Sequence, residues 1–83
     1  MNYSIVITKK AQKFIDKQND IIQKRLFKAM KQLPDFGDIK KLEGQKEKVY
    51  RLRVGSILII YTVDHGKLIV TIIDADNRGQ VYK

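Results

Sequence analysis

The chain has 83 residues and a formal net charge of +8, from 17 Lys and Arg against 9 Asp and Glu. With 43% hydrophobic residues, no cysteine and one histidine, it is expected to form one packed domain over residues 1–83. The composition argues against disulfides, thiol chemistry and a zinc site, and we expect no metal and no cofactor. No apolar run is long enough to cross a membrane and no signal-peptide pattern is visible, so we expect a cytoplasmic protein. The basic excess predicts an anionic partner, either nucleic acid or an acidic protein.

The first half of the chain predicts a strand followed by two helices. Alternating apolar residues indicate a strand over residues 2–7. Thr8 is then suited to cap a helix that ends near residues 18–20, where Asn19 or Asp20 caps the next helix. Apolar residues recur at helical spacing until Pro34 stops this second helix. Two antiparallel helices joined by a tight turn are the simplest arrangement.

The second half predicts a polar loop followed by three strands. Residues 34–48 are polar, contain two glycines and indicate a loop. Strands over residues 49–54 and 57–63 are joined by a two-residue turn, and a third strand follows over residues 68–73. Residues 74–83 are expected to add no more than an edge strand or an extended arm. The sequence therefore predicts an α+β fold of order β-α-α-β-β-β, in which the helices cover one face of an antiparallel three-stranded meander.

Alternation along these strands separates an apolar face from a face that carries two arginines. The turn Gly55-Ser56 places Arg53 opposite Leu58, and the next turn places Val63 opposite Leu68. One face is then hydrophobic apart from two tyrosine hydroxyls, and we expect the helices to cover it. The other face is half apolar and open, and its members are Arg51, Arg53, Leu58, Ile60, Thr62, Ile69, Thr71 and Ile73.

Three short segments carry a family resemblance: "KKLEG" at residues 40–44, "YRLRVG" at residues 50–55 and "RGQVY" at residues 78–82. With the order of elements, they make nearly the whole chain similar to the RelE/ParE toxin superfamily, and more narrowly to RelE-type mRNA interferases. The resemblance implies a toxin that enters the ribosomal A site, cuts mRNA without a metal and forms a hetero-oligomer with an acidic antitoxin. One position departs from the pattern, because Leu58 stands where the family commonly has arginine.

Metal-independent RNA cleavage needs charge stabilisation at the phosphate and a carrier for protons. Arg51 and Arg53 suit the first task because a planar guanidinium binds two phosphate oxygens at once, and the resemblance adds Arg78. The resemblance also supplies Tyr82 as the proton carrier, because arginine does not release its proton. We set His65 aside, because it lies in a turn far along the strand from the arginines. The lysines expected to contact RNA are Lys40, Lys41, Lys46 and Lys48.

Other interpretations of the same residues stay open. The apolar residues expected to bind the antitoxin are Ile60, Ile69 and Ile73. A ParE-type toxin on the same scaffold would block DNA gyrase and need no RNA-cleaving residues, which Leu58 favours. A third alternative is a non-catalytic protein that only binds antitoxin or RNA. The arginine pair is also typical of an edge strand protected against aggregation, or of a surface ion pair with Glu43 or Glu47.

Overall fold

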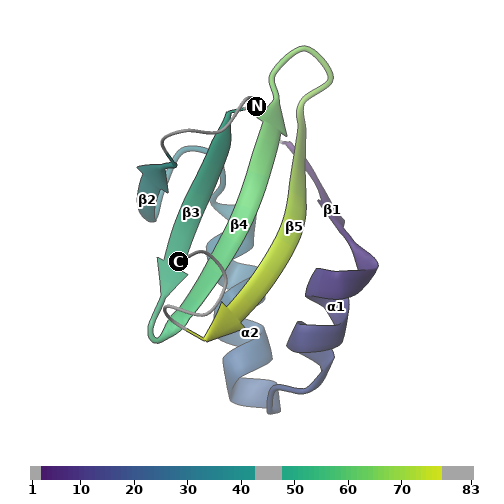
Figure 1. The fold of residues 1–83 in the computed structure, drawn as a ribbon, viewed down its shortest axis with the longest axis vertical. Helices are drawn as coiled ribbons and strands as arrows, with labels where there is room; N and C mark the ends of the chain where they lie inside the picture. Colours follow the sequence, from purple (N-terminus) through teal and green to yellow (C-terminus); the bar gives the residue numbers. More distant parts are fainter. Residues whose placement is uncertain (1–2, 43–47, 78–83) are drawn as a thin grey trace.

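The computed structural model describes residues 3–42 and 48–77 and places two helices on one face of a five-stranded sheet (Figure 1). The strands are β1 (Ser4–Ile7), β2 (Asp38–Lys41), β3 (Val49–Val54), β4 (Ile57–Asp64) and β5 (Ile69–Asn77). Their spatial order is β1-β5-β4-β3-β2, with β1 parallel to β5 and the other neighbours antiparallel. The predicted α+β layout is confirmed. Within the described residues, neither helix is long and apolar enough to cross a membrane.

Both helices begin at caps that the sequence predicts. α1 (Lys9–Asp16) follows Thr8, whose Oγ1 accepts a hydrogen bond from the backbone N–H of Ala11 at 3.3 Å. α2 (Asp20–Lys31) follows Asn19, whose Oδ1 accepts a hydrogen bond from the backbone N–H of Ile22 at 2.9 Å. Each cap satisfies a backbone donor that the first helical turn leaves open. α2 ends shortly before Pro34, as predicted.

The hydrophobic core lies between the helices and one face of the sheet. The helices contribute Ala11, Ile15, Leu26 and Met30, and all four side chains are buried. The buried sheet residues that meet them are Leu52, Ile57, Ile59, Tyr61, Val70, Ile72 and Ala75. Burial of each large aliphatic side chain stabilises the fold by about 1.5–3 kcal/mol. The core therefore determines which sheet face the helices cover, and we call the opposite face the outer face.

The β3–β4 hairpin has the predicted register. Arg53 lies opposite Leu58, and Arg51 lies opposite Ile60. Gly55 in the connecting turn has φ +60°, a conformation that glycine adopts without steric cost. Because strand residues alternate between faces, both arginines belong to the outer face, as the sequence predicts.

The β4–β5 pairing near its turn differs from the predicted register by two residues. Val63 faces Val70 and not Leu68. Leu68 has φ +57° and belongs to the turn, so the strand starts one residue later than predicted. A slip of two residues keeps every side chain on its predicted face, because the side-chain period of a strand is two.

β5 is longer than predicted and contains an irregularity. The consecutive β4 residues Ile60 and Tyr61 pair with Asp74 and Ile72, which leaves Ile73 as an extra residue in β5. Such a bulge bends a strand and allows pairing to resume in a new register. The strand continues to residue 77, so the prediction that it ends at residue 73 is wrong. The polar composition of residues 74–77 hides this extension from pattern analysis.

β2 lies inside the segment that the sequence predicts to be a loop, and that prediction is wrong. Ile39 lies opposite Leu52, and beyond the strand the N–H of Leu42 donates a hydrogen bond to the carbonyl oxygen of Val49 at 2.8 Å. The strand has four residues and one apolar side chain, which is too little for a recognisable alternation. Its pairing with β3 adds Asp38 and Lys40 to the outer face.

The position immediately before β2, Gly37, accepts only glycine without strain, because of both its backbone conformation and its close neighbours. It has φ +132°, and a methyl group at this position would lie 2.6 Å from Cδ1 of Leu52. We expect Gly37→Ala to lower the free energy of unfolding by about 2 kcal/mol, because it combines backbone strain with overpacking of the core. Denaturant unfolding measures the effect. Gly66→Ala is the control, because its added methyl group would meet Asp64 at 3.4 Å, an ordinary contact. An equal loss in both variants would contradict the prediction.

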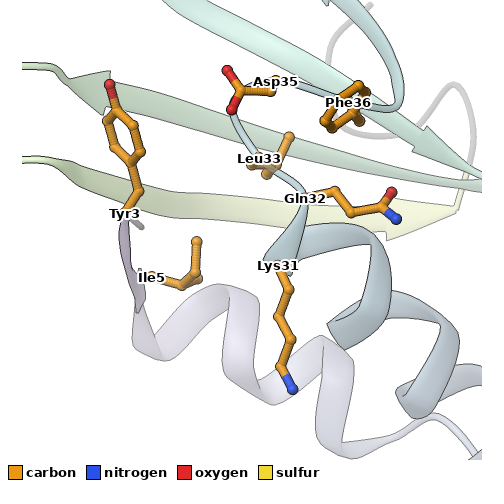
Figure 2. A pocket seen from close by; sticks show the side chains of 7 residues that line it. All are labelled: Tyr3, Ile5, Lys31, Gln32, Leu33, Asp35 and Phe36. Atoms are coloured by element: carbon orange, nitrogen blue, oxygen red, sulfur yellow. The ribbon is translucent and has the colours of Figure 1, made fainter. Parts of the chain in front are cut away.

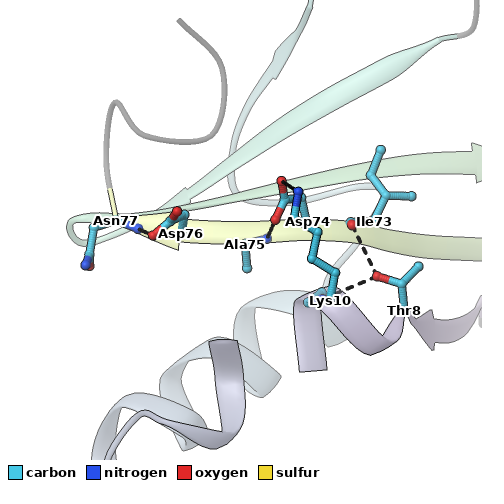
Figure 3. A network of polar contacts seen from close by, with 8 residues as sticks. Thr8, Lys10, Ile73, Asp74, Ala75, Asp76 and Asn77 are labelled. Carbon is cyan, nitrogen blue, oxygen red and sulfur yellow. Dashed lines mark hydrogen bonds and ion pairs between the residues drawn. The ribbon is translucent and has the colours of Figure 1, made fainter. Parts of the chain in front are cut away.

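The connection between β1 and α1 is attached to β5 at the bulge (Figure 3). The Oγ1 of Thr8 donates a hydrogen bond to the carbonyl oxygen of Ile73 at 3.1 Å. The Lys10 ammonium lies 3.0 Å from the Asp74 carboxylate. These contacts satisfy polar groups of the irregular part of β5, and they give Asp74 a cationic partner from α1.

Candidate functional site

Four charged side chains meet on the outer face where β2 and β3 pair. Asp38 lies opposite Arg53, and Lys40 lies opposite Arg51. We call these four residues the charged patch. Like charges directly opposite each other destabilise a sheet, which applies to Lys40 and Arg51. Three cations beside one carboxylate therefore favour the binding of an additional anion.

Asp38 lies between the two arginines without forming a close ion pair with either. Its Oδ1 is 3.9 Å from Nη2 of Arg51, and its Oδ2 is 4.0 Å from Nε of Arg53. Charge-assisted hydrogen bonds between such groups are shorter, at about 2.7–2.9 Å. The Asp38 side chain is 61% exposed, and exposed ion pairs add little to stability. The guanidinium groups thus keep donors that this carboxylate does not satisfy.

Arg51 is the more enclosed of the two arginines. Its side chain is 21% exposed, whereas that of Arg53 is 52% exposed. The Nε of Arg51 is buried and has no hydrogen-bond partner among the described residues. A buried donor without a partner costs about 1–3 kcal/mol. Arg51 is therefore a cation held by its surroundings, and its charge is only partly neutralised by Asp38 at 3.9 Å.

The isoleucines predicted to bind an antitoxin do not form an open apolar surface. Ile60 is 1% exposed, although it lies on the face opposite the helices, in register between Arg51 and Asp74. The prediction that Ile60 is accessible is wrong. Ile69 and Ile73 are half-buried. Among the described residues, the exposed large apolar side chains are instead Val6, Ile21, Phe27 and Phe36.

The structure brings together only part of the predicted site. Lys40 joins the arginines, but Lys41 lies opposite Tyr50 and so belongs to the face that the helices cover. Lys48 is exposed just before β3. Other predicted residues lie outside the described residues, namely Arg78, Tyr82 and Lys46 and the alternative ion-pair partners Glu43 and Glu47. Sequence reasoning missed Asp38, because its segment was expected to be a loop.

His65 lies apart from the charged patch, in the exposed turn between β4 and β5 (Figure 1). Its Nδ1 is 2.8 Å from the hydroxyl oxygen of Tyr3, and the two rings meet edge to face. The prediction that His65 is a turn residue exposed to solvent is confirmed. It has a local partner in Tyr3, which sequence analysis did not foresee.

A groove of about 480 Å³ lies between β1 and the segment that follows α2 (Figure 2). Its walls are Tyr3, Ile5, Lys31, Gln32, Leu33, Asp35 and Phe36. None of these residues belongs to the charged patch. The groove therefore offers no support for chemistry at the arginines.

Tyr61 is a core residue and not a proton carrier. Its ring stacks on Tyr50, with ring centroids 5.5 Å apart and planes 20° from parallel. Burial, with a smaller effect from the Tyr50 phenol, raises the pKa of Tyr61 from 10.0 to about 12. Tyr61 thus keeps its proton throughout the neutral range.

The raised pKa of Tyr61 predicts a loss of stability in alkali. Above pH 10 the unfolded chain releases the Tyr61 proton while the folded chain holds it, so ionisation favours unfolding. We expect this residue to lower the free energy of unfolding by about 1.4 kcal/mol per pH unit from pH 10 to about 12. Unfolding of the wild type and of Tyr61→Phe across this range isolates the effect from the titration of other groups. A difference between the two proteins that does not change with pH would contradict the prediction.

Comparisons with known proteins give a consistent result. A family model described as the ParE toxin of the type II toxin-antitoxin system parDE matches residues 5–82. No protein of curated function matches the chain. Structures with the same fold include a RelE–RelB complex from Pyrococcus horikoshii OT3, with 24% identity, a TM-score of 0.79 and coverage of 98% of this chain and 100% of that chain.

Two further structures show the same likeness. The RelBE2 toxin–antitoxin complex from Mycobacterium tuberculosis is 20% identical, with a TM-score of 0.79 and coverage of 94% of this chain and 100% of that chain. The isolated E. coli RelE toxin is 22% identical, with a TM-score of 0.73 and coverage of 96% of this chain and 90% of that chain. These structures establish a shared fold.

Proposed function

The chain belongs to the family of ParE toxins of type II toxin–antitoxin systems, and we propose that it cleaves mRNA on the ribosome through the charged patch. It is therefore a toxin of the RelE/ParE type from a toxin–antitoxin module. Our proposal concerns the molecule that this toxin acts on. We place its action in the cytoplasm, where ribosomes and mRNA are found.

One observation carries this proposal: Arg51, Arg53 and Lys40 lie together on the outer face, and the Asp38 carboxylate stays 3.9 Å from one arginine and 4.0 Å from the other. Arginine forks match the geometry of phosphate oxygens, and most protein donors to nucleic acids are directed at phosphate. The three cations lie on the sheet face opposite the helices, where Lys40 and Arg53 are exposed and would make the first contacts with an extended RNA strand.

In the proposed reaction, the 2′-oxygen of one nucleotide attacks the adjacent phosphorus while the bond from phosphorus to the 5′-oxygen breaks. The products are a 2′,3′-cyclic phosphate and a free 5′-hydroxyl. Arg51 and Arg53 would bind the two non-bridging oxygens and stabilise the charge that grows on them. A proton leaves the 2′-hydroxyl and a proton reaches the 5′-oxygen. We assign Tyr82 to this proton transfer; it lies outside the described residues.

We also propose that an acidic antitoxin binds this toxin. Related toxins of known structure are seen in complexes with RelB antitoxins. The net charge of +8 and the cations of the outer face are complementary to an acidic partner. An antitoxin that covers the charged patch would block access of RNA to it.

In vitro translation followed by primer extension on the message tests the proposed activity. New 5′ ends that appear only when ribosomes are present support ribosome-dependent cleavage. Message that stays intact at toxin concentrations which arrest growth in cells would overturn the proposal.

Inhibition of DNA gyrase is the second candidate, and Leu58 favours it. This leucine lies in register between Arg53 and Asp76, where RelE-type toxins commonly have an arginine. A supercoiling assay with purified gyrase separates the candidates. Gyrase-dependent DNA breaks support the second candidate, and the absence of both activities supports a protein that only binds its partners.

A further inference from the structure

Asp38 is the acid of the charged patch, and the proposed reaction assigns it no task. Its two carboxylate oxygens approach different arginines, Oδ1 towards Arg51 at 3.9 Å and Oδ2 towards Arg53 at 4.0 Å. Carboxylate and phosphate offer a guanidinium the same kind of acceptor oxygen. Asp38 and a phosphate group therefore require the same space between the two arginines.

We infer that Asp38 is an internal counter-ion that competes with phosphate for Arg51 and Arg53. In the free protein its carboxylate partly neutralises the two arginines, and a bound phosphate displaces it. The inference rests on the proposed function for the identity of the phosphate as RNA. Competition at the arginine pair itself is testable with inorganic phosphate.

The contacts of Asp38 suit a group that is easily displaced. Neither oxygen comes within hydrogen-bond distance of an arginine, and the side chain is largely exposed. Asp38 is also the first residue of a four-residue strand at the edge of the sheet, so few neighbours restrain it. Exposed ion pairs of this kind contribute little to folding, so stability does not explain the carboxylate.

The other described acids of the outer face are engaged elsewhere. Asp74 forms an ion pair with Lys10 at 3.0 Å. Asp76 accepts a hydrogen bond from the N–H of Asn77 at 2.8 Å and is separated from Arg53 by Leu58. Asp64, at the end of β4, accepts a hydrogen bond from the N–H of Lys67 at 2.9 Å. Asp38 is thus the described acid that directs both oxygens at the arginine pair, and its charge lowers the attraction of the patch for any RNA.

Binding of a labelled single-stranded RNA decamer, followed by fluorescence anisotropy at low salt, tests the inference. We expect Asp38→Asn to bind the RNA about three- to tenfold more tightly than the wild type, because it removes one screened repulsive charge. Asp35→Asn is the matched control, because Asp35 is exposed, has the same charge and lies outside the patch. We expect it to change binding by less than about twofold. The gain from Asp38→Asn should vanish when Arg51 and Arg53 are both replaced by glutamine.

A phosphate titration followed through the arginine Nε–H resonances separates this inference from the proposed function. Suppose that neither the wild type nor Asp38→Asn binds the RNA, but that phosphate shifts the Arg51 and Arg53 signals at lower concentration in Asp38→Asn. The counter-ion role of Asp38 then stands, and the proposed action on RNA fails. Equal increases in RNA affinity for Asp38→Asn and Asp35→Asn would show that only the net charge of the protein matters, and they would overturn the inference. Weaker binding by Asp38→Asn would also overturn it, because Asp38 would then hold the arginines in place.

Discussion

Arg51→Gln is expected to lower ribosome-dependent mRNA cleavage by about 10²–10³-fold, the usual cost of removing one positioned donor to a transition-state charge. Glutamine keeps a polar side chain but loses the charge and the forked donor geometry. Expression of the Arg51→Gln variant in cells should therefore no longer arrest growth. The fold should persist, because among the described residues Arg51 forms only a long ion pair, with the exposed Asp38 at 3.9 Å.

Primer extension on translated message measures this loss, and circular dichroism with thermal unfolding checks the fold. Arg25→Gln is the matched control, because Arg25 is an exposed arginine on α2, the helix layer behind the sheet. It should leave cleavage within about twofold of the wild type, since exposed charges act weakly over distance. Full activity in a folded Arg51→Gln variant would show that the charged patch takes no part in cleavage.

The hairpin that carries the arginines is the part of the site that sequence alone predicts best. Two features agree there: apolar alternation along both strands and a two-residue turn at Gly55-Ser56. Together they determine the register, because any odd slip would move the apolar residues out of the core. The position of Arg51 opposite Ile60 follows directly. What alternation does not predict is exposure, since Ile60 is covered on a face that was expected to be open.

Longer-range pairings were harder to predict for physical reasons. β2 has a single apolar residue, Ile39, so its strand character comes from hydrogen bonding to β3 and not from a sequence pattern. The β4–β5 pairing starts two residues out of the predicted register because Leu68 belongs to the turn. The bulge at Ile73 then shifts the register again, and the strand continues through polar residues. Missing β2 also meant missing Asp38, the acid that the described part of the chain places between the arginines.

The second large effect is expected at Leu58, which is half-buried on the outer face next to the arginines. Leu58→Arg would place a new guanidinium in register between Arg53 on β3 and Asp76 on β5. Repulsion by Arg53 should cost up to about 1 kcal/mol of stability. Attraction to Asp76 offsets part of this cost and directs the new side chain. We therefore expect a slightly lower unfolding temperature with an intact fold.

Cleavage by Leu58→Arg should rise by about 10- to 100-fold, because a further guanidinium beside the phosphate adds transition-state stabilisation, though less than a fully positioned donor supplies. The measurement is the rate at which new 5′ ends form on ribosome-bound message. Leu58→Gln is the control, because it loses the same apolar contacts without adding charge, and it should not raise the rate. Asp76→Asn in the Leu58→Arg background should reduce the gain, since the new arginine then loses the carboxylate that orients it. A folded Leu58→Arg variant with unchanged cleavage would place the scissile phosphate away from Arg53.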